Sequence, residues 1–212
     1  MINAVIFDLD GVLAKTDSYH YLSWKRICDN HHFYFDKDIN NELRGISRED
    51  SLRVILRHNK IELNENEFND ICNEENTFYN VLLQGLNEND LFPGTIPVLK
   101  ELRKRGIKLA IGTGTKHADE IIDKLNIRKY FDVIIDGNMV SNPKPDPECF
   151  LLCSKKLDVK PESTFVIEDA DSGIMAAISG NFIPIAVGNA KKSNKAHYNI
   201  QDMKDILVLL NQ

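Results

Sequence analysis

The chain has 212 residues, 42% of them hydrophobic, and a formal net charge of -6. This length is enough for one core, or for a core plus a small accessory domain. The negative balance argues against a nucleic-acid-binding protein, which would need a clustered basic face. It does not exclude a phosphorylated substrate, because a few local lysines can outweigh the global charge. No apolar run is long enough to cross a bilayer, so we expect no membrane partner.

The start of the chain and its cysteines indicate where the protein works. The N-terminus has no basic segment and enters an expected strand almost at once, so we predict no secretion signal. Cys149 and Cys153 lie four residues apart on an expected helix. This spacing favours core packing over a metal site or a disulfide, and Cys28 and Cys72 form no CxxC pair. We therefore expect a reduced, cytoplasmic compartment.

The first predicted strand ends in two acidic residues. Residues 5–13 read VIFDLDGVL, and the apolar residues before Asp8 are typical of a strand buried on both faces. Chemistry in an open α/β sheet lies beyond the carboxyl ends of such strands. Asp8 and Asp10 would repel each other without a cation or a shared proton, and carboxylate oxygens suit Mg²⁺. The alternative is a strand cap followed by a turn in which Gly11 takes a positive φ.

Residues 16–85 interrupt the alternation of strands and helices with polar, helical sequence. Three polar N-cap candidates begin its expected helices: Asp17 with Ser18, Ser47 within a capping box to Asp50, and Asn64. We predict a small helical domain over 16–85, inserted into a main domain formed by 1–15 and 86–212.

After residue 94 the alternation resumes. Helices are expected over 98–104, 117–125, 147–157, 172–179 and 203–210, and strands over 108–112, 131–135, 164–167 and 183–187. Strands that alternate with helices predict an α/β fold with a doubly wound parallel sheet and right-handed crossovers. The polar residues 189–194 are expected to form a mobile loop.

Three further strand ends carry groups that could act on a phosphate. At the end of strand 108–112, the residues GTGTK at 112–116 offer hydroxyls, a lysine and backbone N–H groups that suit a phosphate. The alternative is an ordinary glycine-rich turn in which Thr115 is the N-cap of the next helix. Pro143 and Pro145 restrict the backbone of Lys144, which could instead be a solvated lysine. Glu168 and Asp169 follow strand 164–167 and again need a cation. An N-cap role explains the nearby Asp171 or Ser172 but not this pair.

Taken together, these four strand ends resemble the motifs of the haloacid dehalogenase superfamily, in order, residue type and placement. The resemblance implies a Rossmann-like core with an α-helical cap. Within the superfamily the chain most resembles the β-phosphoglucomutase group. Three stretches carry that closer resemblance: residues 16–20 with Trp24, the run GISREDSL at 45–52, and FPG at 92–94.

The resemblance implies roles for the core residues. Asp8 would be the nucleophile that forms an aspartyl-phosphate, and Asp10 the general acid and base for the sugar hydroxyl. Thr113 and Lys144 would hold the phosphoryl oxygens. Mg²⁺ would be the cofactor. Its ligands would be Asp8, the main-chain carbonyl of Asp10, Glu168 and Asp169.

It also implies roles on the cap side. A second phosphate would bind Arg48 of the cap, because arginine recognises phosphate bidentately. Three groups of residues complete the expected substrate site: Arg48 of the cap with Thr115, Lys116 and His117 of the core around the second phosphate; Gly45 and Ser51 along the sugar; and His20 and Trp24 at the closing interface. His20 could simply pack against Trp24 on its helix, but the resemblance implies that it orients Asp10.

Two positions depart from the pattern of that group. Lys15 stands where relatives usually have a polar or acidic residue. Glu74 and Glu75 lie where the mutases tend to place a lysine that touches the sugar, and a carboxylate can accept hydroxyl hydrogen bonds but cannot replace an ammonium beside a phosphate. The exact sugar therefore stays open.

The leading hypothesis is a sugar-phosphate mutase that interconverts β-D-glucose 1-phosphate and glucose 6-phosphate through a bisphosphate intermediate. The nearest alternative is a phosphatase of small phosphomonoesters on the same scaffold. A receiver-type signalling module also uses an aspartate, Mg²⁺, a threonine and a lysine, but it needs no large insertion after the first strand. A non-catalytic carbohydrate-binding protein would have no use for Asp8. We expect a monomer whose partner is a small phosphorylated sugar.

Overall fold

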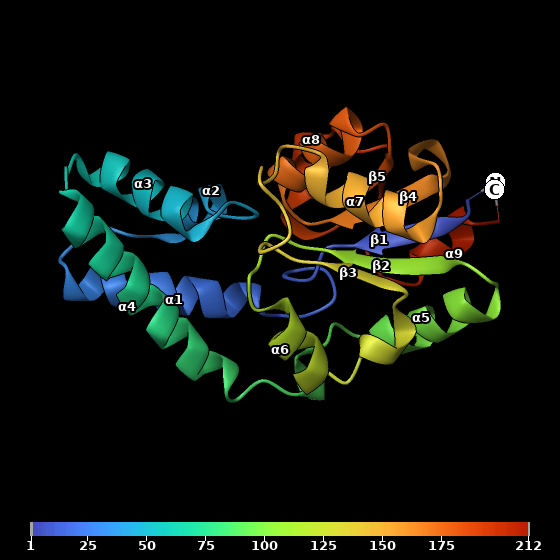
Figure 1. Ribbon diagram of the computed structural model, residues 1–212, viewed down its shortest axis with the longest axis horizontal. Helices are drawn as coiled ribbons and strands as arrows, with labels where there is room; N and C mark the ends of the chain where they lie inside the picture. The colour runs from blue at the N-terminus through green and yellow to red at the C-terminus, as the bar shows by residue number, and fades with distance from the viewer. Residues whose placement is uncertain (1, 212) are drawn as a thin grey trace.

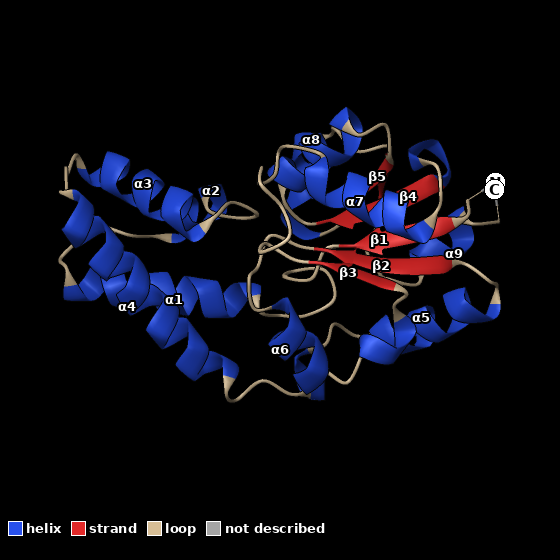
Figure 2. Ribbon diagram, viewed as in Figure 1, coloured by secondary structure: helices blue, strands red, loops and turns tan. Residues whose placement is uncertain are grey.

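A computed structural model of the protein describes residues 2–211. The chain forms two parts that lie side by side (Figure 1). One is a six-stranded sheet with helices on both faces, and the other is a bundle of helices at one end of that sheet (Figure 2). The bundle faces the strand ends from which the loops after β1 and β2 emerge.

The sheet is parallel throughout and has the order β3-β2-β1-β4-β5-β6. Its strands are β1 (Ala4–Phe7), β2 (Lys108–Gly112), β3 (Val133–Ile135), β4 (Thr164–Glu168), β5 (Ile183–Ala186) and β6 (Tyr198–Asn199). Phe7 lies beside Ile111 of β2 and Ile167 of β4, so the ends of these three strands meet at one edge. The predicted doubly wound α/β fold is confirmed.

Strand β1 sends apolar side chains alternately to the two faces of the sheet, and helices cover both faces. Val5 and Phe7 pack among the helices α5 (Thr95–Lys104), α6 (Ala118–Lys124) and α9 (Asp205–Leu209). Ala4 and Ile6 pack against the other face, under α7 (Glu148–Leu157) and α8 (Asp171–Ser179). Four short 3-10 helices complete this part: η1 (Glu88–Asp90), η2 (Arg128–Tyr130), η3 (Pro161–Ser163) and η4 (Gly188–Ser193). A strand buried on both sides is therefore apolar at every position.

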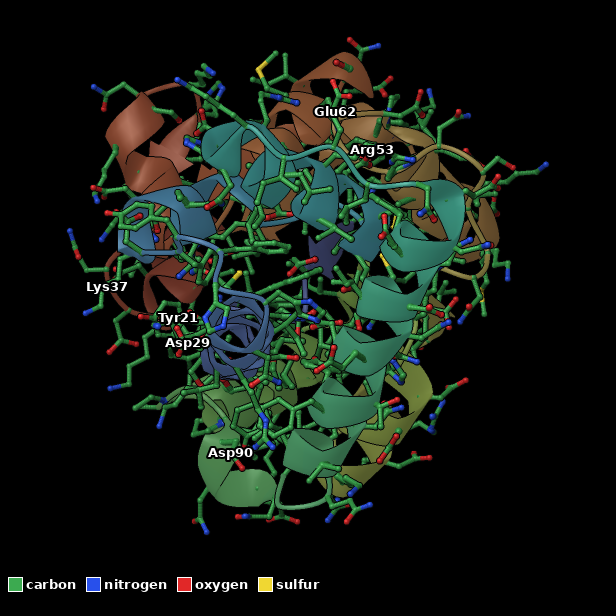
Figure 3. The ribbon with its side chains drawn as sticks, turned by 90° about the vertical axis from the view of Figure 1, so that its left-hand side faces the viewer. Tyr21, Asp29, Lys37, Arg53, Glu62 and Asp90 are labelled. Atoms are coloured by element: carbon green, nitrogen blue, oxygen red, sulfur yellow. The ribbon has the colours of Figure 1, made fainter. Side chains whose placement is uncertain are left out.

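The bundle has a hydrophobic core of its own. It consists of α1 (Asp17–Asn30), α2 (Lys37–Glu42), α3 (Arg48–Asn59) and α4 (Glu65–Leu83). Trp24 and Ile27 of α1 pack with Leu52 and Ile55 of α3 in a cluster that contains no strand residue. Figure 3 views the bundle from its outer side, with Tyr21 and Asp29 labelled on α1 and Arg53 on α3. Each helix of this largely polar segment thus keeps one apolar face, and these faces pack together as the second core.

Helix starts follow the expected chemistry in some places and not in others. Asn64 caps α4 in a full capping box with Glu67, and the Ser47 side chain accepts from the backbone N–H of Asp50 at the start of α3. The Asp50 carboxylate accepts from the Ser47 hydroxyl instead of completing the box. At α1 the expected caps are wrong, because Asp17 and Ser18 lie inside the helix. The N-cap is Thr16, whose side chain accepts no hydrogen bond from the backbone N–H groups of the first turn.

The structure corrects four further expectations. Asp171 and Ser172 do not cap α8, whose N-cap is Ala170; Asp171 pairs instead with Lys195. The stretch 189–194 is largely the 3-10 helix η4, whose Ala190 is buried. Helix α2 and strand β6 were not predicted, since each is too short to show a period.

The cysteine prediction is confirmed. All four cysteines are free and buried, and Cys149 and Cys153 pack from α7 against β2. Across residues 2–211, no helix combines the length and the hydropathy needed to span a membrane.

Candidate active site

A cavity of about 980 Å³, including its open mouth, lies between the bundle and the strand ends. Its wall is formed both by the part that contains the sheet, here the core side, and by the bundle of α1 to α4, here the cap side. Most of the residues expected to form the site line it: Asp8, Asp10, His20, Trp24, Gly45, Arg48, Ser51, Thr113, Thr115, Lys116, His117, Glu168 and Asp169. Lys144 alone of that set lies behind the wall, in contact with Asp8.

Lys144 connects three strand ends. Its Nζ lies 2.7 Å from Asp8 Oδ1 and 2.5 Å from Glu168 Oε1, and it donates to the carbonyl of Gly112 at 3.1 Å. Only 4% of Lys144 is exposed, so the alternative of a solvated lysine is wrong. Burial would lower the pKa of Lys144, but the carboxylates of Asp8 and Glu168 outweigh it and raise that pKa. The amine is therefore a fixed positive charge beneath Asp8.

Three carboxylates gather at the same place. Oxygens of Asp8, Glu168 and Asp169 lie within 4.8 Å of one another, and all three residues are buried. Burial raises the pKa of Glu168 to about 8 and that of Asp169 to about 7, and the charge of Asp8 adds to both effects. Full ionisation of these buried carboxylates is therefore disfavoured near neutral pH unless a further cation lies among them. Hard oxygen donors that need such a cation fit Mg²⁺.

Two glycines make room for these carboxylates. A Cβ built on Gly11 would overlap the carboxylate of Asp169, and one on Gly173 would overlap that of Glu168. Gly11 also has a φ of 80°, which any L side chain would find strained. The glycine of the DLDG motif thus serves both the turn after β1 and the packing of the acidic cluster.

Asp10 lies at the start of the loop after β1, facing the cavity. Its Oδ1 accepts a hydrogen bond of 2.5 Å from the Thr16 hydroxyl. Burial, together with the charge of Asp8, raises the pKa of Asp10 to about 7. A carboxyl group with this pKa can both give and take a proton near neutrality.

His20 approaches Asp10 from the bundle. Its Nε2 lies 4.0 Å from Asp10 Oδ1, and its ring stacks on Tyr79 at 4.3 Å between centroids. Burial lowers the pKa of His20 to about 4, so its ring is neutral at pH 7. His20 therefore packs, here on Tyr79. Its approach to Asp10 is also compatible with the expected role of orienting Asp10.

The loop after β2 brings its hydroxyls to the cavity. Thr113 is buried, and its hydroxyl accepts from the N–H of Thr115 at 3.3 Å. Thr115 is not the N-cap of α6, since His117 holds that position. The N–H of His117 donates weakly to Thr115 Oγ1 at 3.4 Å.

The two cations of the expected second phosphate site, Arg48 of the bundle and Lys116 of the loop after β2, each already have a carboxylate partner. Arg48 donates through Nε to Glu75 of α4, which is buried. Lys116 lies 3.6 Å from Glu49. The ring of His117 bonds Asn76 at 2.9 Å, and burial lowers its pKa. Glu75, Glu49 and Asn76 were not among the expected site residues.

The sequence reasoning also missed Arg44, which joins the bundle to the acidic cluster. Its Nη1 lies 2.6 Å from Asp169 Oδ2 and its Nη2 lies 3.0 Å from Asp17 Oδ2. Its carbonyl accepts from the Ser172 hydroxyl at the start of α8. The next residue, Gly45, has a φ of 72°, and a Cβ there would overlap that hydroxyl. The sequence feature that could have indicated this role of Arg44 is an arginine directly before a glycine, in a loop that faces the acidic cluster.

Comparisons with known proteins agree with this arrangement. A family model described as haloacid dehalogenase-like hydrolase matches residues 5–187. A β-phosphoglucomutase from Bacillus subtilis is 35% identical over 99% of this chain and 93% of its own length. A phosphorylated carbohydrates phosphatase from Thermotoga maritima is 34% identical over 84% and 81%. The crystal structure of a β-phosphoglucomutase from Clostridium difficile has a TM-score of 0.91 and 34% identity, covering 100% of this chain and 96% of that one.

Proposed function

Because this chain belongs to the haloacid dehalogenase-like hydrolase family, we propose that it is a sugar-phosphate mutase of the β-phosphoglucomutase type. It interconverts β-D-glucose 1-phosphate and glucose 6-phosphate. The observation that carries this proposal is one cavity with Asp8 and Asp10 on its core side and Arg48 on its cap side. A reaction with a bisphosphate intermediate needs such an arrangement, with the second anionic group opposite the nucleophile.

In the transfer step, Asp8 attacks the phosphorus atom of the donor. Its Oδ1 is held by Lys144, which leaves Oδ2 free to form the new bond to phosphorus. The bond between phosphorus and the leaving oxygen breaks, and Asp10 gives that oxygen a proton. In the reverse transfer, Asp10 removes the proton from the attacking sugar hydroxyl. The pKa of about 7 suits both tasks.

The remaining core residues position the transferring group. Thr113 holds its oxygens. Lys144 would join it by exchanging one of its three present acceptors, Asp8, Gly112 or Glu168, for a phosphoryl oxygen. Asp8, Glu168, Asp169 and the main-chain carbonyl of Asp10 would hold Mg²⁺, which when bound neutralises charge on the transferring group. Lys144 offsets the negative charge of two of these carboxylates before any ligand enters.

We further propose that residues 16–85 act as a cap that closes over the substrate. Arg48 with Lys116, Thr115 and His117 would bind the second phosphate, Gly45 and Ser51 would line the sugar, and His20 and Trp24 would lie at the closing interface. The separate hydrophobic core of the bundle supports movement of this part as a unit. The free, buried cysteines support a reducing, cytoplasmic location, and we propose a monomer.

A phosphatase on the same scaffold is the second candidate. The pairing of Arg48 with Glu75 and of Lys116 with Glu49 favours it, because both cations of the expected second phosphate site already have counter-charges. The phosphatase from Thermotoga maritima is close in identity to the mutase from Bacillus subtilis, 34% against 35%, although its match covers less of this chain, 84% against 99%. Chemistry up to the aspartyl-phosphate is the same for both candidates. They differ in whether water or a sugar phosphate accepts the group.

One assay separates the two candidates. Purified protein with Mg²⁺ is given β-D-glucose 1-phosphate and a trace of the 1,6-bisphosphate, while glucose 6-phosphate and free phosphate are both followed. Glucose 6-phosphate in excess of free phosphate supports the mutase. Free phosphate without isomerisation replaces the mutase by the phosphatase, and turnover of neither kind contradicts both.

A further inference from the structure

Glu75 is a buried carboxylate at the cap side of the cavity. Only 1% of the residue is exposed, and it lines the cavity wall together with Arg48. Its Oε2 accepts from the Nε of Arg48, but its Oε1 has no hydrogen-bond partner among residues 2–211. A buried carboxylate oxygen without a hydrogen-bond donor destabilises the folded protein. A ligand hydroxyl in the cavity could supply the missing donor.

The neighbouring Glu74 does not face the cavity as Glu75 does. Its carboxylate lies outside the cavity lining and bonds the ring of His31 at 2.7 Å and the amide of Asn30 at 3.0 Å. Consecutive helical residues point in different directions, so only one of the two can face a given site. Glu75 is the one that faces the substrate.

Glu75 also changes the charge that a second phosphate would meet. The guanidinium of Arg48 uses its Nε edge for Glu75, and within residues 2–211 its terminal amines make no hydrogen bond. These amines are free to bind an anion, but a negative charge lies directly behind them. The pair of Lys116 and Glu49 adds no net charge either. The expected second phosphate site is therefore close to neutral, although it contains two cations, Arg48 of the cap and Lys116 of the core.

We propose that Glu75 determines specificity by weakening the hold on a second phosphate while accepting a hydrogen bond from a substrate hydroxyl. This inference rests on the proposed function, in either its mutase or its phosphatase form. In a mutase, the bisphosphate must leave its first orientation so that its other phosphate can meet Asp8. A neutral second phosphate site keeps the bisphosphate from being bound too tightly to turn. In a phosphatase, the same neutrality favours monophosphates.

The test compares binding of two ligands to protein that cannot transfer phosphate. Calorimetric titrations with Mg²⁺ measure glucose 1,6-bisphosphate and glucose 6-phosphate binding to Asp8→Asn, alone and combined with Glu75→Gln. Glutamine keeps an acceptor for Arg48 but removes the charge. We expect the bisphosphate to gain about tenfold in affinity relative to the monophosphate, because one nearby negative charge is lost.

Glu74→Gln is the matched control, since it removes the same charge one residue away and outside the cavity. Its affinity ratio should stay within about twofold of the parent, because exposed charges are screened. Glu75→Gln is also introduced into Arg48→Gln protein, where no buried ion pair remains to be broken. A gain in the same direction is expected there, but smaller than tenfold, because without Arg48 burial favours the protonated form of Glu75. This pair of variants keeps the test available if the single variant fails to fold.

The outcomes distinguish the two levels of the proposal. An unchanged ratio with Glu75→Gln, or an equal rise with Glu74→Gln, overturns the role of Glu75 and leaves the proposed function standing. If neither sugar phosphate binds the parent or any variant, the proposed function fails and the role of Glu75 fails with it.

Discussion

The two walls of the cavity are built by different means. On the core side, Asp8 and Thr113 directly follow β1 and β2, and Glu168 ends β4, so the register of the sheet places all three. Lys144, from the loop after β3, ties three strand ends together. On the cap side, Arg48 and Glu75 come from different helices of a bundle with its own core. Sheet register determines the first set, whereas the packing of α3 on α4 determines the second. The core side should therefore carry the chemistry and the cap side the choice of substrate.

The largest effect is expected on the core side, at the nucleophile. Asp8→Asn keeps an acceptor for the Lys144 amine but removes the attacking anion. Turnover of any phosphorylated substrate should fall by about a thousandfold or more, because no covalent intermediate can form. Steady-state phosphate release and isomerisation both measure it. Retained turnover in protein that is shown by mass spectrometry to carry asparagine would rule out Asp8 as the nucleophile.

Lys144 should come next, with an effect on stability as well as on activity. Lys144→Met leaves the buried Asp8 and Glu168 without their shared counter-charge. Loss of one partner from a buried ion pair costs about 3–5 kcal/mol, so urea unfolding without metal should show a drop of that order. Added Mg²⁺ should recover part of it. Lys195→Met, which breaks the exposed pair with Asp171, is the control and should change stability by less than about 1 kcal/mol. Equal losses in the two variants would contradict the bridging role.

Arg48 tests the other wall. Arg48→Ala should lower the mutase reaction about a hundredfold, since a bidentate cation for the second phosphate is lost. Release of phosphate from a small acyl phosphate, which has no second phosphate, should change much less. The double variant Arg48→Ala/Glu75→Gln controls for the carboxylate left unpaired. Equal loss in both assays would count against a second phosphate site.

The core wall could be predicted from the residues themselves, whereas the cap residues were expected only from the resemblance to the family, and the two ways of building explain why. A strand end is visible in the sequence, and parallel strands bring their ends to one edge, so Asp8, Thr113, Lys144 and Glu168 could be placed together from letters alone. The partner of Arg48 could not, because nothing local says that Glu75 of α4 lies against α3. The buried state of Glu75 was equally hidden, since its helix is polar along most of its length. Short elements such as α2 and β6 were missed because they show no period.

Arg44 joins the two walls, and its effect should be the smallest of the four. Its guanidinium lies against Asp169, one of the proposed Mg²⁺ ligands, so the two cations compete for one carboxylate. Arg44→Ala should therefore tighten Mg²⁺ binding a few-fold in a calorimetric titration, by an amount that shrinks as salt screens the pair. Arg53→Ala removes an exposed cation from the same bundle, paired with Asp50, and should leave the affinity unchanged. Weaker Mg²⁺ binding in Arg44→Ala would mean that the arginine holds Asp169 in place for the metal instead of competing with it. The cap would then help to assemble the site as well as to select the substrate.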